Sequence, residues 1–137
     1  MGLVACTVAQ ASDDELCRRI AAFADAAPAE KPHEVTILTD WGEEQTVGCR
    51  RDESAAARKL CEWLPLHVSI EFMQGNVARV FECFTGESRR APNDVAGKIR
   101  VPEPHYVKTK VWIELEFSTT GKEGELAFLT IRSGRRD

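Results

Sequence analysis

The stretch over residues 105–118 restricts the fold most, because polar and apolar side chains alternate along it. An extended strand turns successive side chains to opposite faces, so this alternation predicts a strand with one buried face. The buried face would hold Val107, Val111, Ile113, Leu115 and Phe117, and the outer face Tyr106, Lys108, Lys110, Trp112, Glu114 and Glu116. Residues 119–124 form a turn and 126–132 resume a strand pattern. The C-terminal part therefore predicts a long β-hairpin.

The rest of the chain predicts helices and short strands. Ser12 and Glu15 form a capping-box pattern at the start of the first helix. Apolar side chains recur at helical spacing over residues 12–27, 53–64 and 70–85, and β-branched residues predict short strands over 34–39 and 46–49. The order is a helix, short strands, a two-helix hairpin and a long β-hairpin. It predicts a single α+β domain over 12–137, with helices packed on an antiparallel sheet.

The first eleven residues have the composition of the end of an export signal. Ala9, Gln10 and Ala11 fit the small-x-small pattern of a cleavage site. Residues 3–6 also fit a lipoprotein signal, in which Cys6 would carry a lipid anchor. The alternative is an ordinary N-terminus rich in small residues. We expect residues 1–11 to be a disordered remnant of an export signal, and the protein to be periplasmic or secreted, with outer-membrane anchoring if Cys6 is lipidated.

Export would place the remaining cysteines in an oxidising compartment, where disulfides are expected. Cys17, Cys49, Cys61 and Cys83 allow three pairings. If Cys49 lies in line with the second helix, it is roughly 18 Å from Cys61, which is too far for a disulfide. The same reasoning places Cys61 about 20 Å from Cys83 along the third helix. We therefore expect the pairs Cys17–Cys61 and Cys49–Cys83.

Composition and motifs give no sign of an active centre. A net charge of −4 disfavours a dedicated nucleic-acid binder. The chain has no phosphate-binding glycine loop and no G-x-S-x-G motif, and its cysteines lack zinc-ligand spacing. His33, His67 and His105 are not part of any paired motif. We expect no catalytic residues, no cofactor, no metal site and no membrane-spanning segment.

Two groups of residues are the candidates for binding. Aromatic and basic side chains interleave on the outer face of the predicted long strand, where they suit contact with a macromolecule. Arg89 and Arg90 form the second group, because they lie in a polar stretch and arginine pairs recognise carboxylates and other anions. This stretch, residues 85–104, is either a functional loop or contains a short strand near residues 98–101. The candidate binding residues are therefore Tyr106, Lys108, Lys110, Trp112, Arg89 and Arg90. The alternative for both groups is a solvated surface.

These observations favour a small exported bacterial protein of the cell envelope that binds a protein partner, of the inhibitor or immunity type. The runner-up is a periplasmic carrier of a small amphiphilic ligand, which predicts a cavity between the second and third helices and the sheet, lined by Phe72, Met73, Phe81 and the inner face of the strands. A cell-wall hydrolase is the third alternative, and it requires a cleft in which a histidine meets a carboxylate or a serine.

Overall fold

The computed structural model describes residues 5–40, 46–68, 73–87, 96–119 and 127–136. Its elements follow in the order α1 (Ala5–Asp25), β1 (His33–Asp40), β2 (Thr46–Arg51), α2 (Ala55–Trp63), η1 (Leu64–Leu66), α3 (Met73–Thr85), β3 (Ala96–Val101), β4 (Val111–Ser118) and β5 (Ala127–Arg135). None of the described helices is both long and apolar enough to span a membrane.

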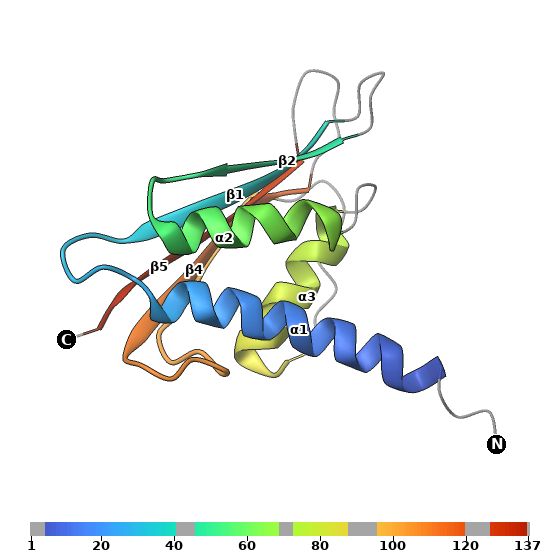
Figure 1. Cartoon of the computed structure of the whole chain (residues 1–137), viewed down its shortest axis with the longest axis horizontal. Helices are drawn as coiled ribbons and strands as arrows, with labels where there is room; N and C mark the ends of the chain where they lie inside the picture. Colours follow the sequence, from blue (N-terminus) through green and yellow to red (C-terminus); the bar gives the residue numbers. More distant parts are fainter. Residues whose placement is uncertain (1–4, 41–45, 69–72, 88–95, 120–126, 137) are drawn as a thin grey trace.

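The strands form one antiparallel sheet in the order β2-β1-β5-β4-β3. All three α-helices lie on the same side of this sheet (Figure 1). The hydrophobic core fills the space between the two layers and includes the largest fully buried side chains, Phe23 and Phe84. The predicted single α+β domain, with helices on one face of an antiparallel sheet, is confirmed.

The predicted C-terminal pair of antiparallel strands is present, but its first strand is shorter than predicted. Strand β4 begins at Val111, and its inward residues Ile113 and Leu115 are fully buried. Residues 102–110 form an irregular loop instead of the start of the strand. The carboxylate of Asp25 in α1 accepts hydrogen bonds of 3.0 Å from the backbone N–H groups of Lys108 and Thr109. These bonds hold the loop against the helix and take its backbone out of the strand.

The first helix starts earlier in the structure than predicted. Helix α1 begins at Ala5, so Ser12 lies inside the helix, and residues 5–11 are helical where disorder was expected. Residues 1–4 lie outside the described part of the chain. The export signal stays a prediction. Of the two alternatives for residues 85–104, a loop or a hidden short strand, the strand is present, and β3 forms one edge of the sheet.

The expected disulfide pairs are wrong: the bonds are Cys17–Cys83 and Cys49–Cys61. Cys49 lies in strand β2 and not in line with the helix. The chain reverses between β2 and α2, so the rise along the strand is offset by the rise back along the helix. The Cα atoms of Cys49 and Cys61 are therefore 5.5 Å apart. Cys17–Cys83 joins α1 to α3.

Candidate functional site

The side of the sheet that faces away from the helices is the candidate site, and we call it the outer face. Among the described residues no helix covers it (Figure 1). Strand alternation and the pairing register place its side chains in rows that cross the strands. The outer face includes Glu34, Thr36, Leu38, Arg50, Ala96, Lys98, Arg100, Trp112, Glu114, Glu116, Ser118, Phe128, Thr130, Arg132 and Gly134.

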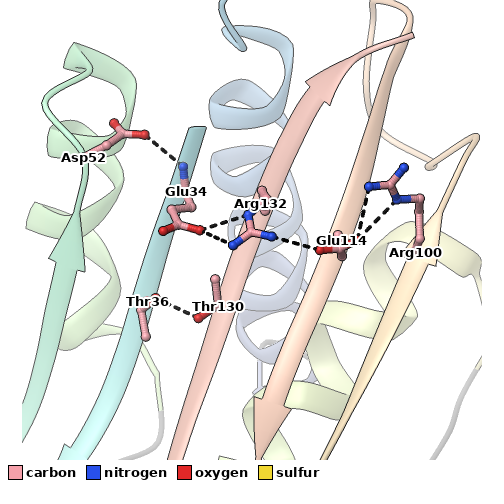
Figure 2. A network of polar contacts seen from close by, with 7 residues as sticks. All are labelled: Glu34, Thr36, Asp52, Arg100, Glu114, Thr130 and Arg132. Carbon is pink, nitrogen blue, oxygen red and sulfur yellow. Dashed lines mark hydrogen bonds and ion pairs between the residues drawn. The ribbon is translucent and has the colours of Figure 1, made fainter. Parts of the chain in front are cut away.

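A row of four charged side chains crosses the outer face from β1 to β3 (Figure 2). Arg132 of β5 binds Glu34 of β1 through Nε at 2.9 Å and Nη2 at 2.6 Å. The Nη1 atom of Arg132 reaches Oε1 of Glu114 in β4 at 3.2 Å. Arg100 of β3 completes the row with Nε and Nη2 at 3.3 and 3.2 Å from Oε2 of Glu114. We call these four residues the charge row.

The charge row is held in place by partial burial and by its own pairing. Glu114 is only 7% exposed, so its carboxylate depends on the two arginines that flank it. The hydrogen bond to Glu34 raises the pKa of Arg132, as do the charges of Glu34 and Glu114. The backbone N–H of Glu34 donates to Asp52 at 2.9 Å, which fixes the outer end of the row. The arrangement presents alternating charges in fixed positions.

Trp112 lies beside the charge row on the outer face and is half-buried. Its indole ring lies over Gly134 of the neighbouring strand, where an added Cβ would be 2.4 Å from Cζ2 of the ring. The guanidinium of Arg100 is 4.1 Å from the ring centroid, in cation–π geometry. Trp112 therefore connects the charge row to a flat aromatic surface.

Replacing Gly134 by alanine is expected to destabilise the fold by about 1–3 kcal/mol, because the new methyl group overlaps the indole ring. Urea unfolding of Gly134→Ala measures the loss. In the double variant Gly134→Ala/Trp112→Ala the ring is gone, so the added cost of the Gly134 change should largely disappear. An equal cost in both backgrounds would show that the close packing of Trp112 on Gly134 is wrong.

The structure separates the binding residues predicted from the sequence. Trp112 lies on the outer face, whereas Tyr106, Lys108 and Lys110 are exposed in the irregular loop beside α1. The hydroxyl of Tyr106 donates to Asp14 of α1 at 2.9 Å. Their predicted common face is therefore wrong, because it required residues 105–110 to be extended.

The second predicted group, Arg89 and Arg90, lies outside the described residues. Sequence reasoning missed the charge row. Each of its members occupies an outward position of a strand, but their proximity depends on the order β1-β5-β4-β3. That order brings together segments that are far apart in the sequence, and no local motif marks it.

His33, Asp52 and Ser54 meet at the corner where β1, β2 and α2 join. Nδ1 of His33 is 3.5 Å from the hydroxyl oxygen of Ser54. That oxygen accepts the N–H of Ala57 and so caps helix α2. His33 is 1% exposed and its ring stacks on Phe23. This cluster closes a corner of the fold, and its enclosed histidine gives no support to the hydrolase alternative.

Stability is expected to fall between pH 7 and pH 5 because of His33. Burial lowers the pKa of His33 below 6.5, with a smaller effect of Arg135 in the same direction, and the charge of Asp52 offsets this only in part. The unfolded chain then binds more protons than the folded chain below pH 6.5, so acid favours unfolding. Urea midpoints at pH 7 and pH 5 measure the effect. His33→Phe should flatten this dependence.

Asp52 contributes to the pH dependence of stability in a lower pH range than His33. Desolvation would raise the pKa of Asp52, but hydrogen bonds from the N–H groups of Ser54 and Glu34 outweigh it, so the pKa lies below 3.8. Its contribution to stability is present above pH 3.8 and is lost as the pH falls through the lower, folded-state pKa. A pH dependence between 7 and 5 that His33→Phe leaves unchanged would contradict the assignment to His33.

Two open grooves lie around α1, on the helical side of the molecule. One of about 620 Å³ separates α1 from the loop that holds Tyr106 and Lys108. The other, about 780 Å³, lies between α1 and α2. The cavity expected for a ligand carrier was to be lined by Met73 and Phe81, but these side chains are 1% and 7% exposed members of the core. Phe72 lies outside the described residues.

Within the part of the chain that the structure describes, no three histidine, cysteine or acidic side chains are arranged to hold a metal ion. Comparisons with models of protein families, with curated proteins and with solved structures found no match for this chain.

Proposed function

We propose that this protein is a small macromolecule-binding module of the bacterial cell envelope, of the inhibitor or immunity type, and that it binds a protein through the outer face. The observation that carries the proposal is the charge row on a sheet face that no described helix covers. Groups already held in place lose little side-chain entropy on binding. A fixed pattern of charges favours a partner with the complementary pattern.

The pattern of signs favours a protein partner over a nucleic acid. Binding of phosphates requires arginines and lysines that are free to pair with them. Arg132 and Arg100 are each paired with a carboxylate, so the charge row offers both signs in alternation. Trp112 adds the kind of aromatic surface that is enriched at the centre of protein interfaces.

Two disulfides support a place outside the reducing cytoplasm. Together with the predicted export signal, they favour the periplasm or the extracellular medium as the compartment. The partner we propose is therefore a protein of the cell envelope.

An affinity experiment with immobilised protein and an envelope extract tests the proposal. Thr36→Arg places a long charged side chain on the outer face, in the row next to the charge row. Ala22→Arg adds the same side chain on exposed α1, on the helical side. We expect a protein retained by the wild type and by Ala22→Arg to be lost from Thr36→Arg.

The reverse result, with the retained protein lost from Ala22→Arg and kept by Thr36→Arg, would place binding on the helical side and reject the outer face. The free energies of unfolding of both variants, measured in urea, provide the control for folding.

A further inference from the structure

The charge row has an even number of members and alternating signs. Read from β1 to β3 it runs Glu34, Arg132, Glu114, Arg100. Read from the other end, every sign is reversed. A second outer face turned by 180° about an axis parallel to the strands would therefore place a guanidinium opposite every carboxylate.

We propose that the outer face binds a second copy of this chain, related by a two-fold axis that runs parallel to the strands between β5 and β4. The inference rests on the proposed role of the outer face as a binding surface, and a second copy bound there has to leave before another protein binds the same face. Glu34 then lies opposite Arg100 of the second copy, and Arg132 lies opposite Glu114 of the second copy. The symmetry makes each of these contacts occur twice.

The neighbouring rows are compatible with the same axis. In the row next to the charge row, the register places threonines on β1 and β5 and charged residues on β4 and β3. In the row after that, it places apolar side chains on β1 and β5 and small ones on β4 and β3. The facing pairs would be Thr36 with Lys98, Thr130 with Glu116, Leu38 with Ala96, and Phe128 with Ser118.

The other possible two-fold axis in the plane of the interface runs along the charge row, and it gives an unfavourable dimer. It would set Glu34 against Glu34 and Arg132 against Arg132 of the second copy, and like charges in contact cost several kcal/mol. The axis parallel to the strands also leaves the mean strand directions of the two sheets close to each other. Packed twisted sheets usually differ in strand direction by about 30°, so this arrangement is an ordinary one.

Burial of this face costs less than burial of separate ions would. Glu114 is already 7% exposed and bonded to two arginines, so it is largely desolvated in the single chain. The face of the Arg100 guanidinium lies on Trp112, so carboxylates reach it at its donor edge, part of which already bonds Glu114 of the same chain. Pairing between copies adds one more partner to groups that are already fixed.

Charge reversal at the ends of the row tests the arrangement. Arg100→Glu sets Glu34 against a glutamate of the second copy, and Glu34→Arg sets an arginine against Arg100. Each change also places like charges side by side within one chain, a glutamate at position 100 beside the buried Glu114 or an arginine at position 34 beside Arg132, so urea unfolding of each variant at low protein concentration must first show that it is folded. Sedimentation velocity over a range up to about 0.5 mM should show a wild-type dimer and at least a hundredfold weaker association for each variant.

Mixing the two variants gives the sharpest result. In a pair of one Arg100→Glu chain and one Glu34→Arg chain, every facing position again has opposite signs. We expect a 1:1 dimer from two chains that are each monomeric, and a restored dimer in the double variant. Residues 34 and 100 are three strands apart, about 14 Å, so the restoration cannot come from contact within one chain. Lys59→Glu on α2 is the control and should leave the dimer unchanged.

A crosslinking experiment avoids changes in the charge row. Thr36→Cys and Lys98→Cys chains should form a mixed disulfide under mild oxidation, whereas two Thr36→Cys chains should not pair with each other. A wild-type monomer at the highest concentration, or a mixture of the charge variants that stays monomeric, would overturn the inference. If the wild type is monomeric but retains an envelope protein that Thr36→Arg loses, the inference fails and the proposed function stands. If the wild type is monomeric and retains no such protein, both fail.

Discussion

Replacing Cys17 and Cys83 by alanine is expected to lower the free energy of unfolding by about 4 kcal/mol. This disulfide closes a loop of 66 residues and joins α1 to α3 across the core, with both cysteines buried. A cross-link over a longer loop removes more entropy from the unfolded chain. Such a loss is a large share of the ordinary stability of a domain, about 5–15 kcal/mol. Denaturant unfolding of the double variant measures it.

Removing the Cys49–Cys61 pair provides the matched comparison. Its loop spans 12 residues, so the expected cost is only about 3 kcal/mol. Both of its cysteines are half-buried, whereas Cys17 and Cys83 are buried, so a dithiol reagent should reduce the 49–61 bond first. Peptide mapping with alkylation follows the order of reduction. Earlier reduction of the 17–83 bond, or a larger loss of stability from the 49–61 variant, would contradict these assignments.

Replacing Arg132 by methionine is expected to cost about 2 kcal/mol. The change takes one of two arginines from the buried Glu114 and the guanidinium partner from Glu34. Loss of one partner of a buried ion pair typically costs about 3–5 kcal/mol, but Arg132 is 34% exposed, so solvent screens part of this. Urea unfolding at a single low protein concentration measures the difference while keeping association constant.

Arg18→Met is the control for the loss of an arginine as such. Arg18 pairs with Asp14 on the surface of α1 and is 73% exposed, so its removal should have a small effect of less than about 1 kcal/mol. Equal losses for Arg132→Met and Arg18→Met would show that the charge row adds nothing to the fold.

The sequence was sufficient to predict the class of fold, because that information is local. Alternation along residues 111–118 and helical spacing before Pro28 both survive in the structure. The loop over 102–110 was missed because its conformation depends on Asp25, which lies far away in the sequence. An alternating pattern cannot reveal that a distant carboxylate binds the backbone.

The disulfide pairs and the charge row required knowledge of how the elements are arranged. The wrong pairing followed from one assumption, that Cys49 continues the axis of the second helix, whereas it lies in strand β2. The charge row depends on β5 lying between β1 and β4. That position makes Arg132 the link between Glu34 and Glu114, which are 80 positions apart in the sequence.

Oxidative footprinting in the native envelope extract tests the outer face as a binding surface most directly. If that face is occupied, Trp112 and Phe128 should be oxidised more slowly in the extract than in dilute purified protein. Leu66 and Tyr106, exposed by 80% and 47% away from the outer face, should react at the same rate in both. Equal oxidation of Trp112 and Phe128 in the two samples, or slower oxidation of Leu66 and Tyr106 alone, would contradict the account.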